Sequence, residues 1–332
     1  MAKKKPPIKT IFPWQTAIWH RLWRCHAEQR LPHALWFVGM SGVGKKIFAE
    51  VFAQAVLCKQ PNVAGLPCGD CHSCCLFQAQ SHPDVVSIEP EKAGQAIKID
   101  QIREMIDFAS KTALQGGYRI MLIYSAANMN TYAANALLKT LEEPGTNTII
   151  ILVSDRNKEL PATLRSRCQR VLFPTPSQEI ALAWLRGQGK NEAQEWSQLL
   201  KIANGAPMRA IQFLDADVLT LRSDLFKGLA DMLQQKGDAL KYAAQWQAAD
   251  ILQLLDFMLS FLCDLLRLQA QCGEESVVNT DFMQLLLTLK SHFTTTKIVK
   301  YVDYLQQVRR YLLEFNLNKQ LLLEDIFIRF AY

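Results

Sequence analysis

The chain has 332 residues, 49% of them hydrophobic, which is enough for two or three domains with full cores and excludes a largely disordered protein. Its net charge of +6 permits contact with nucleic acid or acidic partners without requiring it. No apolar stretch follows the basic residues 1–7, and charged residues interrupt the apolar segment 251–268, so we predict neither a secretory signal nor a membrane span. We expect a cytoplasmic protein whose nine cysteines are reduced, with some of them on a metal.

The first half of the chain alternates short apolar segments with helical ones. Strands are predicted at 35–38, 84–88, 119–124 and 148–153, and helices at 45–57, 99–110 and 132–142. This alternation is typical of a parallel sheet with helices on both faces, and such folds bind ligands beyond the carboxyl ends of the strands. Two short helices are predicted next, at 179–185 and 193–203.

The composition changes after Pro207. All thirteen prolines lie at or before this residue, and only three glycines interrupt the leucine-rich stretches after it. Apolar residues at three- and four-residue spacing in 251–265 and 298–312 predict amphipathic helices. We therefore predict three domains: an α/β domain at 1–175, a small helical lid at 176–212 and an all-helical domain at 213–332.

The segment Gly39-Met40-Ser41-Gly42-Val43-Gly44-Lys45 has the glycine and lysine spacing of a phosphate-binding P-loop, and it follows the predicted strand 35–38. The next position, where a Ser or Thr hydroxyl would hold magnesium, is Lys46.

A second metal-holding element would be an acidic residue at the end of another buried strand. The best candidate strand, 120–123, continues into Tyr124-Ser125-Ala126-Ala127, which contains no carboxylate. Hydrolysis of a nucleoside triphosphate needs the magnesium ion that these groups would hold. The sequence therefore predicts the scaffold of a nucleotide site that does not hydrolyse its own nucleotide.

A cysteine cluster lies between residues 58 and 75. Three cysteines, Cys68, Cys71 and Cys74, recur with two residues between them, and Cys58 stands at the end of a predicted helix. Four thiolates at this spacing can surround one zinc ion, and a closed set of four indicates a structural site. Cys75 and His72 are possible substitutes, and unliganded thiols are the alternative interpretation. Direct DNA binding is disfavoured because residues 58–77 contain one Lys and no Arg.

A helix predicted at 135–142 stops before Pro144, and a short basic segment follows the next strand. In Arg165-Ser166-Arg167-Cys168, two arginines flank a serine. An arginine in such a loop can reach across a subunit boundary and stabilise charge on another protein's phosphates. The alternative is a solvated or salt-bridged pair of arginines.

Taken in order, the loop at 39–45, the four cysteines, segment 135–144 and Ser166-Arg167-Cys168 resemble the delta-prime subunits of the bacterial DNA polymerase III clamp loader. The resemblance is tight over 32–173 and loose afterwards, although 318–322 is also similar to the final helix of that family. The related gamma/tau subunits carry Gly-Lys-Ser/Thr and an Asp-Glu pair where this chain has Lys46 and Tyr124-Ser125. The delta subunits generally lack both the cysteines and the Ser-Arg-Cys motif.

The resemblance implies roles for particular residues. Arg167, with its motif neighbours Ser166 and Cys168, would be an arginine finger that points into the ATP site of a neighbouring gamma/tau subunit. The chain's own site would be vestigial or weak, and Ser154 would replace a polar sensor residue. The residues implied for that site are Gly39, Gly42, Gly44, Lys45 and a lid arginine, Arg209.

The resemblance also implies an architecture and a function. The fold would be an α/β P-loop (AAA+) domain with a zinc-binding insertion at 58–75, a small helical lid and an all-α collar that joins the subunits. With gamma/tau and delta in a hetero-pentameric ring, the chain would help open the sliding clamp and load it on primed DNA. It would be a part, without ATPase activity of its own, of the DNA polymerase III holoenzyme, a DNA-directed DNA polymerase and thus a nucleotidyltransferase complex.

Two other functions remain open from the residues. An active gamma/tau-like ATPase would show magnesium-dependent hydrolysis that a change of Lys45 abolishes. A zinc protein that binds nucleic acid directly would show a DNA affinity that falls steeply with salt.

Overall fold

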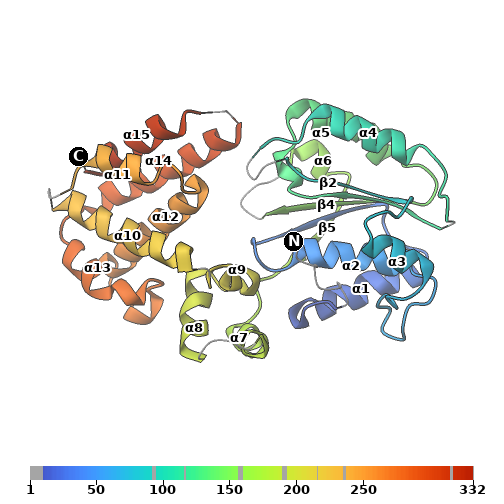
Figure 1. Ribbon diagram of the computed structural model, residues 1–332, viewed down its shortest axis with the longest axis horizontal. Helices are drawn as coiled ribbons and strands as arrows, with labels where there is room; N and C mark the ends of the chain where they lie inside the picture. The colour runs from blue at the N-terminus through green and yellow to red at the C-terminus, as the bar shows by residue number, and fades with distance from the viewer. Residues whose placement is uncertain are drawn as a thin grey trace. The chain divides into compact units, whose positions relative to one another are not determined.

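The computed structural model describes residues 10–91, 95–115, 117–155, 160–188, 193–214, 216–234, 237–314 and 317–331. They form two compact units, Met1–Trp184 and Leu185–Tyr332 (Figure 1). The boundaries of three domains, predicted at 175 and 212, stay a prediction.

A parallel sheet is the centre of the first unit. Its strands, in the spatial order β2-β3-β4-β1-β5, pair in parallel throughout. Their bounds are β1 Ala34–Gly39, β2 Val85–Ile88, β3 Arg119–Ile123, β4 Thr148–Asp155 and β5 Gln169–Phe173. All residues of β1 and β3 are buried, as expected for strands covered on both faces. The predicted α/β class is confirmed.

Helices cover both faces of this sheet. In Figure 1, α4 and α5 lie on one face, and α1, α2 and α3 lie on the other. The bounds are α1 Thr16–Ala27, α2 Lys45–Leu57, α3 His72–Gln78, α4 Ile99–Ala109, α5 Thr131–Glu142 and α6 Ala162–Arg165. One core cluster packs Trp36 and Met121 of the sheet against Ile102 of α4 and Leu137 of α5. The carboxyl ends of β1 and β4 thereby meet at one edge, where the P-loop begins.

The second unit is helical in the residues that the structure describes. Helix α7 Gln178–Gly187 spans the division between the units. The later helices are α8 Ala193–Ile202, α9 Pro207–Gln212, α10 Ala216–Leu233, α11 Ala239–Gln245, α12 Ile251–Gln269, α13 Met283–Leu289, α14 Thr295–Glu314 and α15 Lys319–Ala331. Helix α12 is the central one, since it buries Phe261 and Leu265 completely and packs against α10, α13 and α14. The predicted all-helical C-terminal part is confirmed.

A buried charged network ties together the helices of the second unit. The guanidinium of Arg222, in a side chain that is 2% exposed, donates to Asp281 and to Asn279 Oδ1. Its Cζ atom lies 4.9 Å and 5.0 Å from the ring centroids of Phe226 and Phe282. The network links α10 to the segment that follows α12, and removal of one partner would leave a buried polar group or charge unpaired.

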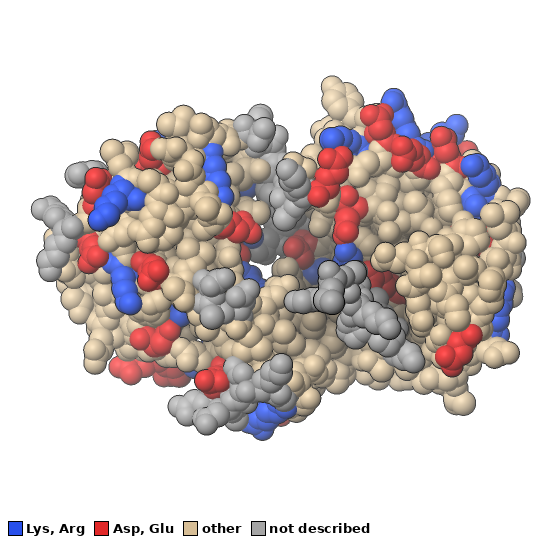
Figure 2. Space-filling model, viewed as in Figure 1, with Lys and Arg blue, Asp and Glu red and all other residues tan. Residues whose placement is uncertain are grey.

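No helix among the described residues is long and apolar enough to cross a membrane. On the face shown in Figure 2, acidic and basic side chains of the described residues are interspersed on both units. This distribution fits the modest net charge of +6.

Candidate functional site

The P-loop connects β1 to α2 in the way that its sequence predicts. Gly42 has φ 82° and Gly44 has φ 87°, values in the left-handed region that favours glycine. A Cβ on Gly44 would also lie 2.4 Å from Cε2 of Phe12, so no larger residue fits there. The loop thus requires glycine both for its backbone conformation and for its neighbours.

Lys45 folds back onto the loop. Its side chain is 5% exposed, and Nζ donates to Gly39 O at 2.8 Å, to Met40 O at 2.7 Å and to Asp155 Oδ1 at 2.8 Å. These three acceptors match the three hydrogens of an ammonium group. A phosphate would therefore have to replace one of them, and Asp155, the last residue of β4, already supplies a negative charge.

An aromatic cluster that sequence reasoning missed covers the far side of the loop. Trp14 Nε1 and Gln15 Nε2 both donate to Val43 O at 3.0 Å. The ring of Phe12 stacks on that of Trp14 at 4.8 Å, and Trp184 meets both rings edge-on at 5.2 Å and 5.4 Å. The segment before α1 therefore fixes Val43 and Gly44 in place.

A cation lies where the magnesium-binding hydroxyl would be. Lys46 Nζ pairs with the carboxylate of Glu89 and lies 4.5 Å from the ring centroid of Tyr124. The Tyr124 hydroxyl donates to Glu50 Oε1 at 3.3 Å, and burial together with the Glu50 charge raises the pKa of this phenol. A protonated phenol and an ammonium group offer no ligand to a divalent cation.

The side chain of Ser154 has a partner within the sheet. Its hydroxyl, in a residue that is 2% exposed, accepts a hydrogen bond from Trp36 Nε1 at 2.7 Å. The next residue, Asp155, makes the contact with Lys45. The role of sensor inferred for Ser154 stays a prediction, and this bond does not support it.

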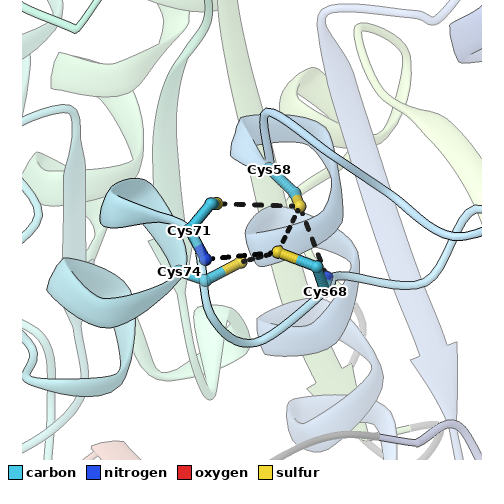
Figure 3. A group of neighbouring side chains, drawn as sticks. All are labelled: Cys58, Cys68, Cys71 and Cys74. Atoms are coloured by element: carbon cyan, nitrogen blue, oxygen red, sulfur yellow. Dashed lines mark hydrogen bonds between the residues drawn. The ribbon is translucent and has the colours of Figure 1, made fainter.

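The four predicted cysteines lie together. Their sulfur atoms are all within 4.8 Å of one another and turn toward a common centre (Figure 3). Cys58 caps the end of α2, Cys68 lies in the connecting loop, Cys71 caps the start of α3, and Cys74 lies one turn into that helix. The structure thus brings residues of two helices and a loop to one point.

The spacing of these sulfurs fits a tetrahedral metal site. Four sulfurs at zinc–thiolate bond length lie about 3.8 Å from one another. The separations here are 3.5 Å for Cys58 to Cys68, 3.9 Å for Cys58 to Cys71 and 3.9 Å for Cys68 to Cys74. Backbone N–H groups of Cys68 and Cys71 also point at the sulfurs of Cys58 and Cys68, at 3.4 Å and 3.3 Å. The cluster can hold a metal ion and is compatible with zinc.

The thiol of Cys71 is poised to ionise. Burial raises its pKa, but hydrogen bonds from the backbone of Cys74 and Lys59 and from the thiols of Cys74 and Cys68 outweigh burial and lower the pKa to about 6. Thiolates are the form that binds zinc. The possible substitutes Cys75 and His72 lie outside the cluster, and the Cys75 thiol instead points to Asp70 O at 3.5 Å.

Helix α1 and a buried histidine support the cysteine module. Trp19 Nε1 donates to Ala64 O at 2.9 Å, in the loop between Cys58 and Cys68. The Ser73 hydroxyl donates to Leu57 O at 2.9 Å and lies 3.0 Å from His82 Nε2. His82 Nδ1 accepts the Asp84 N–H at 3.1 Å, so the proton of the neutral ring is on Nε2.

Arg167 is held against its own domain. Its Nε donates to Glu142 Oε1 at 2.7 Å, and Nη2 lies 2.5 Å from the same oxygen. Its Nη1 donates to Thr163 O at 2.9 Å and to Ser166 Oγ at 3.2 Å. Glu142 is the last residue of α5, so this contact joins the predicted motif at 135–144 to the Ser166-Arg167-Cys168 motif. Burial raises the pKa of the neighbouring Cys168 thiol to about 11, which keeps this thiol protonated and unreactive.

Arg209 lies in the second unit, within α9. Its Nη2 bonds Asp256 Oδ2 at 2.7 Å, and Arg309 Nη1 bonds the other oxygen of the same carboxylate at 2.6 Å. The predicted nucleotide contact of Arg209 remains a prediction.

A five-stranded parallel sheet, a glycine-rich loop between β1 and α2 and a helical second unit together define a P-loop protein of the AAA+ class. A family model described as DNA polymerase III, delta subunit, matches residues 14–177, and one described as DNA polymerase III, delta subunit, C terminal, matches residues 216–331.

Individual proteins are similar over nearly the whole chain. The chain is 34% identical to DNA polymerase III subunit delta' of Pseudomonas aeruginosa over 97% of each. It is 30% identical to the protein of the same name from Haemophilus influenzae over 96% of each. Among solved structures, a gamma subunit-related protein of Thermotoga maritima aligns over 94% of this chain and 98% of that one, with 20% identity and a TM-score of 0.44. The identities with these two delta' proteins show that the chain belongs to the DNA polymerase III subunit delta' family.

Proposed function

We propose that this chain is a clamp-loader subunit that does not hydrolyse ATP itself and that supplies Arg167 to the ATP site of a neighbouring gamma/tau subunit. The observation that carries the proposal is the contrast between two sites. The chain's own site has Lys46 after the loop and Tyr124 after β3 where metal-holding groups would be, whereas the Arg167 side chain is partly exposed, at 35%.

The chain's own site lacks what hydrolysis needs. Magnesium neutralises charge that develops on the phosphates during transfer, and its usual protein ligands are a hydroxyl after the loop lysine and an acidic residue ending a strand. Here Lys46 is paired with Glu89, and β3 ends before Tyr124. Weak binding of nucleotide through Gly39, Gly42, Gly44 and Lys45 stays compatible with the fold.

The cysteine cluster acts as a structural zinc site in this proposal. All four ligand positions of a tetrahedral ion would be taken by Cys58, Cys68, Cys71 and Cys74, so no position is left for a substrate. The ion would close the segment that connects α2 to α3.

The partners follow from the family. The second unit would be the collar through which the chain joins gamma/tau and delta in a hetero-pentameric ring in the cytoplasm. The ring would open the sliding clamp and place it on primed DNA. The chain is also 33% identical to the tau/gamma subunit of Haemophilus influenzae over 141 residues, which are 42% of this chain and 20% of that protein.

The test is an arginine variant in the reconstituted complex. Removing a finger lowers turnover at its site by on the order of a thousandfold or more. We expect Arg167→Ala to assemble normally and to remove at least the share of DNA-stimulated ATP hydrolysis that this one site contributes. Arg165→Ala, two residues earlier in the same turn, is the matched control and should keep the full rate. An unchanged rate in Arg167→Ala would remove the finger from the proposal.

A further inference from the structure

We propose that Glu142 is a latch: its carboxylate holds the Arg167 guanidinium until a phosphate of the neighbouring subunit takes its place. This inference rests on the proposed function, since it assigns a regulation to the same finger. It goes beyond that function because nothing in a finger mechanism requires the arginine to have an internal anionic partner.

The hydrogen bonds of Arg167 show that its guanidinium is bound to groups of its own domain. A guanidinium has five N–H hydrogens. Nε uses its hydrogen on Glu142 Oε1, and Nη1 uses two on Thr163 O and Ser166 Oγ. Nη2 lies 2.5 Å from the same Glu142 oxygen, so the carboxylate covers the edge formed by Nε and Nη2. An arginine that binds phosphate through two parallel hydrogen bonds must therefore first give up a partner on its own domain.

The partner that a phosphate would replace is the carboxylate. Both contacts of Glu142 are made to the Nε and Nη2 edge of the guanidinium, the edge that matches two oxygens of a carboxylate or a phosphate. The bonds of Nη1 to Thr163 O and Ser166 Oγ can persist through this exchange and keep the arginine aimed. Glu142 therefore occupies the place of the incoming anion.

Two features make this contact reversible. Both side chains are partly exposed, Arg167 at 35% and Glu142 at 50%, so water weakens the ion pair. Glu142 is also the last residue of α5, and a negative charge is unfavourable at the C-terminal end of a helix. The pair is thus strong enough to order the arginine in the free subunit and weak enough for a doubly charged phosphate group to displace it.

A latch predicts that removing the charge of Glu142 raises activity. Exposed ion pairs change equilibria by up to about fivefold. In the reconstituted complex, the share of kcat/KM for ATP that depends on Arg167 is the difference between the complex and its Arg167→Ala form. We expect Glu142→Gln to raise this share by about two- to fivefold, because the phosphate no longer has to displace a carboxylate. The double variant Glu142→Gln with Arg167→Ala should match Arg167→Ala alone. Glu143→Gln, which removes the adjacent charge at the same helix end, is the matched control and should keep the original kcat/KM.

A second measurement follows the latch in the chain alone. In the 15N-labelled protein, the Nε–H signal of Arg167, assigned by its loss in Arg167→Lys, should exchange slowly with water and become fast in Glu142→Gln but not in Glu143→Gln. This readout needs no ATP and no partner. It separates the ion pair itself from the function proposed for the arginine.

The possible results distinguish failure of the latch from failure of the proposed function. A lower or unchanged kcat/KM in Glu142→Gln, when Arg167→Ala lowers the rate, overturns the latch and leaves the finger in place. A raised kcat/KM that persists in the double variant also overturns it, because the gain would then not pass through Arg167. If Arg167→Ala has no effect, the proposed function fails and the latch with it, even where the Nε–H signal shows the ion pair.

Discussion

Gly65 links the cysteine module to α1, and replacing it by alanine tests how tightly the two are joined. The residue has φ 78°, in a turn where its N–H donates to Asn62 O at 2.8 Å. A Cβ built on it would lie 2.2 Å from Nε1 and 2.3 Å from Cε2 of Trp23. The indole of Trp23 stacks on that of Trp19, with ring centroids 6.1 Å apart, and Trp19 in turn donates a hydrogen bond to Ala64 O in this loop. A shift of the Trp23 ring would therefore disturb the contacts that hold the turn.

The structure gives a magnitude for this change. A left-handed conformation costs a residue with a Cβ about 1–2 kcal/mol. Displacing a packed indole ring costs about 1–3 kcal/mol in addition. We therefore expect Gly65→Ala to lower the local unfolding free energy of the α1 and cysteine module by about 2–5 kcal/mol. Gly117→Ala provides the control, because Gly117 has φ 108° but no atom within 4 Å of its Cβ position.

Hydrogen exchange followed by mass spectrometry measures this locally, which matters because the two units need not unfold together. In the zinc-loaded chain, peptides from α1 and from 58–75 should lose protection in Gly65→Ala by the full 2–5 kcal/mol, estimated as above. Gly117→Ala should change its own segment by only about 1–2 kcal/mol. Equal losses in the two variants would refute the reasoning, since they would mean that the contact with Trp23 adds nothing to the backbone strain.

Three further predictions concern the metal, a histidine and the second unit. Elemental analysis should find about one zinc per chain. The zinc should be lost in Cys71→Ser and retained in Cys75→Ser, because Cys71 is one of the four clustered cysteines and Cys75 is not. Burial lowers the pKa of His82 below its ordinary 6.5, so the unfolded chain takes up its proton first. The unfolding free energy measured in urea should therefore fall as pH drops below about 6.5, less so in His82→Gln. Arg222→Ala leaves Asp281 without its buried partner and should destabilise the second unit by about 3–5 kcal/mol in the same urea titration, whereas an effect near zero would contradict the network.

Patterns local in sequence predicted most of the fold. The helix predicted at 45–57 is α2, residue for residue: the glycine-rich loop precedes its first residue, and the backbone becomes extended at Cys58. Four of the five strands were found from apolar runs. Strand β5 was missed because it is a short edge strand that begins with the exposed polar residues Gln169 and Arg170. Its apolar run, 171–173, is only three residues long.

The partners of the site residues could not be predicted, because they come from distant parts of the chain. Asp155 is 110 positions from Lys45, and Glu142 is 25 positions from Arg167. Only the parallel register that sets Gly39 beside Asp155 brings the first pair together. The four cysteines, in contrast, lie within one short segment, and their spacing alone indicated the cluster.

The central claim is that the chain has a P-loop but does not hydrolyse ATP itself. An ATP hydrolysis assay of the isolated chain tests this claim most directly. Purified free of partners and given ATP with magnesium, the chain should show no turnover above background, and Lys45→Ala should give the same result. Magnesium-dependent release of phosphate at a rate typical of ATPases, abolished by Lys45→Ala, would contradict the account and make the chain an active ATPase.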